Sequence, residues 1–265
     1  MIEKILTISI FIILAGTGCT GFIAETDLQD DWLIAETEHI VLHYRPWDYS
    51  DSASPSTGQA LEIAQNQEFY LRAIRDSLTV EFSNRVLIYL FNQDEAAGHI
   101  GTNAGGHCIP KLNTIYYTFI HFDRPYTDRF GIEDPALGAH EMVHVISHQS
   151  LGYPGTKLMS EGYANWIDGG FARFSIIDLL RTYREKHPER VLTPAQLLEE
   201  TGQPDYIYYP NAGMFTGFLM SAYGVEKVHR LFNVGTAAFR QAFETHCSET
   251  WDQMEDNYAE WLKAW

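Results

Sequence analysis

Two histidines and a glutamate in the middle of the chain have the spacing of a metal site. The segment from His140 to His144 reads H-E-x-x-H, with Glu141 as its second residue. Side chains four residues apart on a helix lie one above the other, so both imidazoles can bind one ion. The Glu141 carboxylate then lies beside the ion without binding it, where it can accept a proton from water. The pattern predicts a catalytic zinc site.

A third protein ligand must come from outside this motif. Ser150 stands where one class of zinc peptidase carries a third histidine, which excludes that class. His148 continues the stripe, but it lies about 6 Å further along the helix axis than His144, too far for a bond of about 2.1 Å. Glu161 opens the next expected helix and can return to the ion. We therefore predict one Zn²⁺ per chain, held by His140, His144 and Glu161.

The elements that hold these residues are predicted from apolar spacing and cap residues. We expect the motif helix over residues 136–149, with Asp134 as its cap, Pro135 at its first position and Gly152 just beyond its end. A turn is expected at residues 104–106. Strands are expected over 39–44, 85–91 and 113–122, and helices over 57–78, 160–167, 176–186, 194–200, 212–223, 225–232 and 251–265.

The order of these elements predicts an α+β fold. An N-terminal lobe over residues 35–155 contains a small mixed sheet and a long helix, and a helical C-terminal lobe over residues 156–265 carries the third ligand. The motif helix lies at the seam between them.

At this point the sequence resembles the gluzincin zinc metallopeptidases, in particular the peptidase MA-like family. In that family H-E-x-x-H is followed by a helix beginning E-G-x-A, as at residues 161–164 here. Residues 209–219 are similar to the family segment Y-x-x-A-G-x-F-x-x-Y-L, and the likeness covers about residues 35–235. The spacing to Glu161 is slightly shorter than in thermolysin-like members. The resemblance implies a zincin-like fold and zinc-dependent hydrolysis of peptide bonds in a peptide or protein substrate.

The resemblance also implies roles for residues outside the motif. It makes Tyr209 the donor to the oxyanion, with Tyr206 and Tyr208 as alternatives. Asn165 stands where thermolysin-like relatives carry an aspartate that orients an imidazole, and Asp168 is a second candidate for that task. The glycine pair at residues 105–106, followed by the strand from residue 113, resembles the edge strand with which gluzincins bind an extended peptide.

The first eighteen residues have the composition of a signal peptide. One lysine is followed by a short apolar run and then by small residues before Cys19. The run is too short to span a bilayer stably, and the cysteine resembles the lipidated residue of a bacterial lipobox. We expect a signal peptide over residues 1–18, a membrane anchor through lipid on Cys19, a tether over residues 19–34 and a location in the bacterial cell envelope. Ordinary secretion and an uncleaved anchor are the alternatives.

Charge and cysteine content narrow the possible partners. Eighteen Lys plus Arg face 35 Asp plus Glu, a net charge of −17, which disfavours nucleic acid as a partner. Lipidation of Cys19 would leave Cys108 and Cys247, which form either one disulfide or a pair of buried thiols.

Two other functions stay open: a non-catalytic zinc-containing envelope lipoprotein that acts as a binding or scaffold module, and a zinc amidohydrolase with a non-protein substrate.

Overall fold

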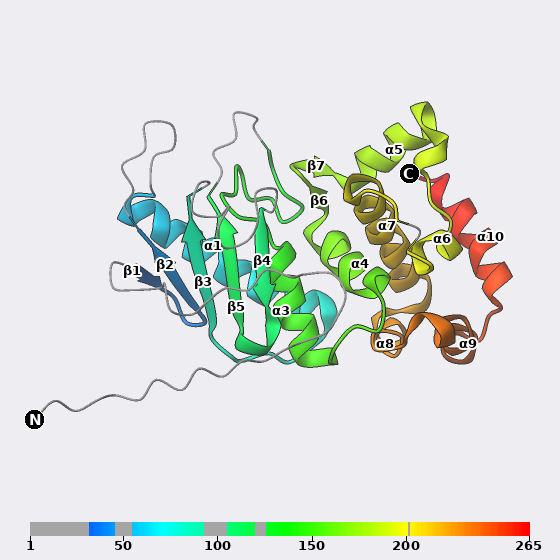
Figure 1. Cartoon of the computed structure of the whole chain (residues 1–265), viewed down its shortest axis with the longest axis horizontal. Coiled ribbons are helices and arrows are strands. Elements are labelled where there is room, and N and C mark those ends of the chain that lie inside the picture. Colours follow the sequence, from blue (N-terminus) through cyan, green and yellow to red (C-terminus); the bar gives the residue numbers. More distant parts are fainter. Residues whose placement is uncertain (1–31, 46–54, 93–104, 120–125, 201) are drawn as a thin grey trace, which may run out of the picture.

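The computed structural model describes residues 32–45, 55–92, 105–119, 126–200 and 202–265. The α+β class predicted from the sequence is confirmed, since a five-stranded mixed sheet is followed by a series of helices (Figure 1). The signal peptide over residues 1–18, the Cys19 lipid site and most of the tether lie outside the described residues. Within the described ranges, no helix has both the length and the apolar character that crossing a membrane requires.

The sheet has the strand order β1-β2-β3-β5-β4. β2, β3 and β5 run parallel, and β1 and β4 are antiparallel strands at the two edges. The strand bounds are Leu33–Glu36 for β1, Ile40–Tyr44 for β2, Val86–Phe91 for β3, Gly106–Ile109 for β4 and Thr114–Thr118 for β5.

Two sequence-based expectations at the sheet edges are corrected. β1 begins at Leu33, inside the segment expected to be a tether, because residues 33–36 pair in register with β2. Residue 106, expected in a turn, opens β4 instead. β4 is therefore the edge strand, and the strand predicted from residue 113 is β5, which lies between β3 and β4.

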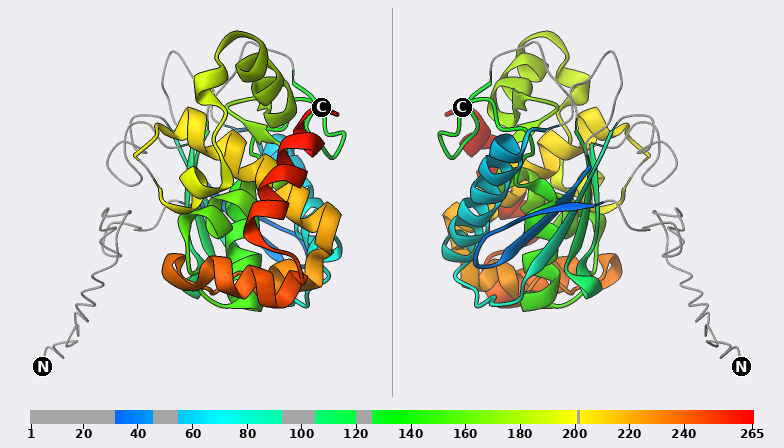
Figure 2. Two further views of the ribbon diagram at one scale, coloured as in Figure 1. Left: turned by 90° about the vertical axis from the view of Figure 1, so that its right-hand side faces the viewer. Right: turned by 90° about the vertical axis from the view of Figure 1, so that its left-hand side faces the viewer.

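Helix α1, Thr57–Leu78, has the bounds predicted from its apolar spacing. Ser56 and Gln59 form a capping box at its start, which satisfies backbone N–H groups that have no partner within the helix. The helix lies against one face of the sheet (Figure 2). Its apolar stripe is buried there, through Ala60, Ile63, Ala64, Leu71 and Ile74.

Helix α3, His140–Leu151, carries the H-E-x-x-H motif, and it begins four residues later than predicted. Asp134 does not cap it, because the backbone and carboxylate of Asp134 bond to Tyr126 instead. The N-cap is Ala139, whose side chain accepts no hydrogen bond. Gly152 ends the helix as predicted, with a φ of 90° that favours glycine.

The rest of the chain is mainly helical. The helices are α4 (Lys157–Asp168), α5 (Ile176–Lys186), α6 (Pro194–Leu198), α7 (Asp205–Tyr223), α8 (Val225–His229), α9 (Thr236–Cys247) and α10 (Trp251–Leu262), with a small hairpin of β6 (Gly170–Phe171) and β7 (Phe174–Ser175) and single 3₁₀ turns η2 (Pro110–Leu112) and η3 (Pro188–Arg190). The bounds of α5 match the prediction, and α9 was not predicted.

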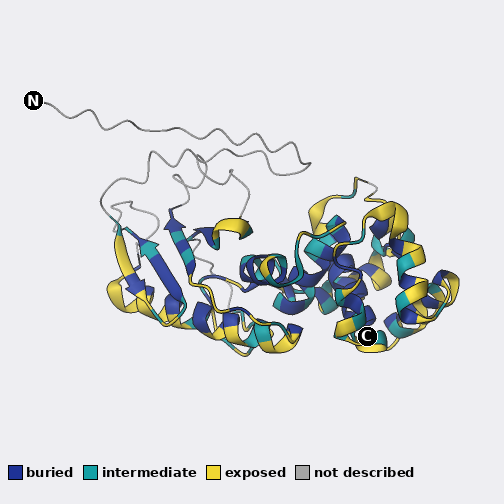
Figure 3. Ribbon diagram, turned by 90° about the horizontal axis from the view of Figure 1, so that it is seen from below, coloured by how far each residue is buried: buried dark blue, intermediate teal, exposed yellow. Residues whose placement is uncertain are grey.

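Helices α4 and α7 pack closely at two glycines. A side chain at Gly162 would clash with Thr216 on α7, and one at Gly217 would clash with the Trp166 ring on α4. Buried residues are concentrated where these two helices meet (Figure 3). This contact fixes the position of α4, which carries the predicted third ligand.

Helix α7 begins at Asp205, seven residues before the predicted start, despite Pro210 within it. A proline cannot donate the helical hydrogen bond to the carbonyl four residues earlier, here that of Tyr206. The Tyr183 hydroxyl donates to that carbonyl at 2.6 Å instead. The three tyrosines at 206, 208 and 209 are therefore on a helix, which fixes the direction of each ring.

The two cysteines in the described residues are not joined to each other, so of the two alternatives that the sequence left open, the Cys108–Cys247 disulfide is not formed. Cys108 lies on the edge strand β4, whereas Cys247 is the last residue of α9. Burial raises the pKa of the Cys247 thiol to about 11, which keeps it protonated at neutral pH.

Candidate metal centre

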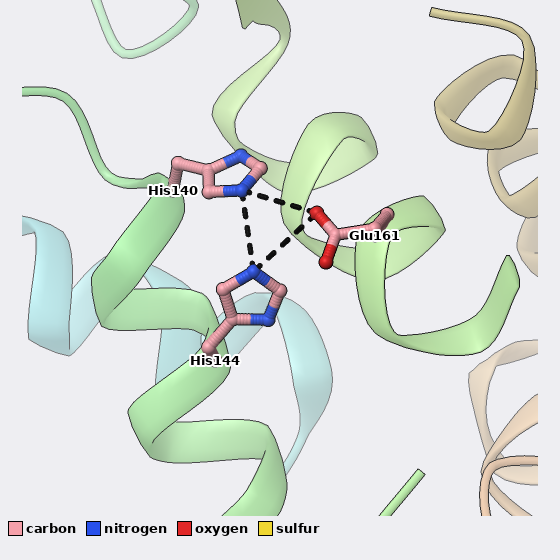
Figure 4. A group of neighbouring side chains, drawn as sticks. All are labelled: His140, His144 and Glu161. Carbon is pink, nitrogen blue, oxygen red and sulfur yellow. Dashed lines mark hydrogen bonds and ion pairs between the residues drawn. The ribbon is translucent and has the colours of Figure 1, made fainter. Parts of the chain in front are cut away.

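The three predicted ligands converge on one point (Figure 4). The Nε2 atoms of His140 and His144 lie 3.2 Å apart. Glu161 Oε2 lies 3.4 Å from the first nitrogen and 3.6 Å from the second. Two imidazole nitrogens and one carboxylate oxygen thus form a nearly equilateral triangle.

The size of this triangle fits a tetrahedral zinc ion. Bonds of about 2.1 Å at tetrahedral angles place any two ligand atoms about 3.4 Å apart. All three observed separations lie within a few tenths of an ångström of that value. Two histidines and one carboxylate also leave a fourth position open, as in catalytic zinc sites. The donor set and its geometry therefore fit this ion.

Two helices supply the ligands. His140 and His144 are one turn apart on α3, and Glu161 lies in the first turns of α4, whose start is capped by Thr156. The His140 side chain keeps 24% of its surface exposed, so the site can be reached from solvent. The two helices are linked by a loop of only five residues, 152–156, in line with the short spacing to Glu161 in the sequence.

Ser160 is a site residue that the sequence analysis missed. Its hydroxyl lies 3.4 Å from the Nδ1 atom of His144. A partner on the second ring nitrogen fixes the orientation of an imidazole ligand. The sequence signal that could have indicated Ser160 is its position directly before Glu161, because the two residues lie at the same end of the helix.

The two predicted imidazole partners have other contacts. Asn165 donates from its amide to the Glu161 backbone carbonyl at 2.8 Å. Asp168 Oδ1 accepts the backbone N–H of Ala139 at 2.7 Å, directly before the first metal ligand. Among the described residues, no hydrogen bond joins either side chain to an imidazole. Asp168 instead holds the start of α3 against the end of α4.

Neighbouring carboxylates make the site favourable for a cation. Burial lowers the pKa of His140, but a hydrogen bond to Glu161 and the charges of Glu141, Glu161 and Asp168 raise it to about 9 overall. Burial acts to raise the pKa of Glu161, yet the two histidines hold it well below its usual range. Both shifts favour positive charge at this point, which is also what a bound cation would supply.

Glu141 lies against the edge strand. A Cβ atom added to Gly106 would lie 2.7 Å from Glu141 Cγ and 2.9 Å from the Tyr117 ring, so only glycine fits there. His107, the next residue, points to the opposite face of the sheet, away from α3. The predicted base is therefore directly beside β4, which is an edge strand of the sheet in the described part of the chain.

The structure separates the three candidate tyrosines. The Tyr209 ring stacks on that of His140, with centroids 6.1 Å apart and planes at 13°. The buried hydroxyl of Tyr208 donates to the Leu197 carbonyl, and the Tyr206 ring is exposed. Of the three, Tyr209 is the one whose ring contacts a metal ligand.

A cavity of about 440 Å³ lies elsewhere in the structure, between the end of α1 and helices α4 and α7. None of its lining residues belongs to the metal centre. Arg129 is the charged residue in its lining, and its guanidinium lies over the Trp166 ring and donates to the Trp166 carbonyl. This contact caps the last turn of α4, so it has a structural explanation.

No family model matches the chain, and no curated protein matches it significantly. The function must therefore be argued from the site itself.

Proposed function

We propose that the chain is a zinc-dependent peptidase with a zincin-like fold of the gluzincin type. The observation that carries the proposal is the triangle of His140, His144 and Glu161 atoms, whose edges match those of a tetrahedral zinc site. Glu141 supports catalysis over a purely structural role, because a structural site has no need of a non-ligand carboxylate. The parallel strands, the antiparallel edge strand β4 and the motif helix beside it agree with the fold that the resemblance implies.

Each residue has a defined task in this proposal. Zinc, when bound, supplies a Lewis acid that makes water nucleophilic at neutral pH. Glu141 accepts a proton from the attacking water and delivers it to the leaving amine. The Tyr209 hydroxyl donates a hydrogen bond to the oxyanion that forms at the scissile carbonyl.

Strand β4 can align the substrate. The Thr118 N–H donates to the Gly105 carbonyl, so residue 105 bonds inward to β5. In an antiparallel ladder, residues that hydrogen-bond to the neighbouring strand alternate with residues that do not. The backbone groups of Gly106 and Cys108 therefore point to the outer edge of the sheet. A peptide that adds to this edge has its backbone next to Glu141.

We also propose a cellular location for the protein. A signal peptide over residues 1–18 and lipid on Cys19 would place the peptidase in the bacterial cell envelope. Mass spectrometry of the mature N-terminus tests this directly, because lipidation adds a defined mass to Cys19.

Zinc content and cleavage of a fluorogenic peptide library test the activity together. The protein from Cys19 onward, with that cysteine replaced, is compared with its His140→Ala and Glu141→Gln variants. We expect about one zinc per chain in the wild type and in Glu141→Gln, loss of zinc in His140→Ala, and loss of cleavage in both variants. Protein that binds no zinc when zinc is supplied contradicts the proposal. Zinc without peptide cleavage favours the scaffold module or an amidohydrolase with another substrate.

A further inference from the structure

A continuous row of ring side chains passes through the metal centre. Each ring centroid lies between 4.8 and 6.1 Å from the next. The row runs in the order Phe171, Tyr209, His140, His144, His148, Tyr153. The metal ligands are in its middle, and His148 and Tyr153 extend it toward the end of α3.

His148 faces the side of α3 on which the reaction is proposed to occur. At about 100° per residue, it lies about 20° around the helix from Glu141 and about 40° from His144. Both of its ring nitrogens are buried and have no hydrogen-bond partner among the described residues. Because these nitrogens have almost no accessible surface, a bound peptide does not reach them, and His148 acts as a buried ring behind its neighbours. The Phe232 ring, 6.1 Å away, backs the imidazole.

Strand β4 leads from Glu141 to His148. Its first residue, Gly106, lies against Glu141, and directly after its end the Pro110 carbonyl accepts a hydrogen bond from Gln149. β4 therefore runs beside α3 in the direction from the base toward His148. The rise from residue 141 to residue 148 is about 10 Å, roughly three residues of extended peptide.

Tyr153 is the most exposed of the large hydrophobic side chains in the described part of the chain, at 73%. Its ring lies 5.4 Å from that of His148, so a buried imidazole supports an exposed aromatic ring. An exposed ring that is supported in this way suits a large apolar side chain of a peptide, which can stack on it.

We propose that His148 and Tyr153 form a subsite that binds a large apolar, preferably aromatic, side chain of the substrate about three residues from the scissile bond. The side chain packs on the Tyr153 ring, and the buried His148 imidazole holds that ring in position. This subsite rests on the proposed peptidase function. It makes the substrate class peptides with an aromatic residue at a fixed distance from the cleaved bond.

Cleavage-site profiling of the zinc-loaded protein tests the subsite. Two variants are compared with the wild type: Tyr153→Ala removes the exposed ring, and His148→Ala removes the imidazole that supports it. Phe69→Ala is the matched control, because Phe69 is also exposed and lies on α1. We expect the wild type to prefer an aromatic residue at one position, and Tyr153→Ala to lower kcat/KM for such peptides about tenfold, mainly through KM. His148→Ala weakens the same preference by less than Tyr153→Ala does, at unchanged zinc content, and Phe69→Ala changes neither the preference nor the zinc content.

Peptide binding to the zinc-loaded Glu141→Gln variant, followed by fluorescence, distinguishes failure of the subsite from failure of the peptidase proposal. Cleavage with the same preference in wild type and Tyr153→Ala overturns the subsite and leaves the peptidase proposal intact. Neither cleavage nor binding of any peptide overturns both. Weaker binding of aromatic peptides when Tyr153→Ala is added to the Glu141→Gln background supports the subsite independently of turnover.

Discussion

Two clusters of histidine and glutamate in this molecule have similar composition and different chemistry. In the metal centre, the three converging atoms lie 3.2 to 3.6 Å apart. In the second cluster, formed by Glu38, His39 and Glu68, the His39 Nδ1 and Glu68 Oε1 atoms lie 2.8 Å apart, a direct hydrogen bond. The first spacing leaves room for an ion at the centre, and the second does not.

The second cluster also contains its own cation. The Arg72 guanidinium lies 3.0 Å from Glu38 and 3.1 Å from Glu68. The Glu68 carboxylate accepts further bonds from the Thr37 hydroxyl and the His39 backbone N–H. Ligand types alone therefore do not define a metal site. What matters is whether protein donors already satisfy the carboxylate.

The largest expected effect separates the two glutamates. Glu161→Gln should lower zinc affinity at least about 100-fold, because an amide replaces the anionic ligand. Glu68→Gln should leave zinc affinity unchanged and lower the free energy of unfolding by about 1–3 kcal/mol, because it weakens a network of charged hydrogen bonds. Competition with a chelating dye measures the first effect and urea denaturation the second. Equal zinc affinity in the two variants would remove the distinction.

The second prediction concerns the contact between the metal centre and the sheet edge. Gly106→Ala should lower kcat at least about tenfold with zinc retained, since the new methyl displaces Glu141 or Tyr117. Gly105→Ala is the matched control, because no atom lies within 4 Å of a Cβ at that position. Steady-state kinetics and zinc analysis of both variants check this. Similar kinetics in the two variants would show that β4 does not constrain the base.

The two clusters should respond to pH in opposite directions. In metal-free protein the pKa of His140 is raised from 6.5 to about 9, so its contribution to stability is complete below pH 6.5 and is lost as the pH rises through 9. Burial acts to raise the pKa of Glu68, but its bonds to His39 and Thr37 lower it from 4.5 to about 2. Its contribution is therefore present above pH 4.5 and lost as the pH falls through 2.

Urea denaturation of chelator-treated protein across this pH range measures both losses of stability, the alkaline limb due to His140 and the acid limb due to Glu68. Zinc-loaded protein should lack the alkaline loss, because its imidazole ligands are already neutral. The Glu68→Gln variant should lose the acid limb and keep the alkaline one. An alkaline limb that persists after zinc loading would argue against His140 as a ligand.

The smallest expected effect is that of Ser160. Its hydroxyl lies 3.4 Å from His144 Nδ1, near the upper limit of a hydrogen bond, so Ser160→Ala should weaken zinc binding only a few-fold. Dye competition at fixed pH measures the change. A loss as large as that of Glu161→Gln would mean that the serine does more than orient the ring.

The sequence predicted those parts of the fold that depend on neighbouring residues. The bounds of α1 and α5 follow from apolar spacing, and the convergence of His140 and His144 follows from helical geometry. The start of α3 was wrong, because the tertiary contact between Asp134 and Tyr126 removes the expected cap. The start of α7 was missed, since a hydroxyl from Tyr183 compensates for a proline within the helix.

The choice of Tyr209 among three tyrosines required the structure. All three have the same chemistry and nearly the same position in the chain, and only the packing of α7 decides which ring contacts His140. The glycine at residue 106 was read as a turn because its close contact with Glu141 is a tertiary feature. Local patterns predict ligands on one helix, whereas partners from separate elements depend on packing.

Asp168 and Glu161 lie two turns apart on α4, and each contacts the start of α3, one through the Ala139 backbone and one through the imidazoles. The Asp168 contact needs no ion, so it fixes the register of the two helices in the apoprotein. Little of the zinc binding energy is then used to fold the chain, in contrast to zinc fingers. A chelator should therefore strip the metal from a protein that keeps its secondary structure, and zinc should rebind at a rate limited by ligand deprotonation and ion entry.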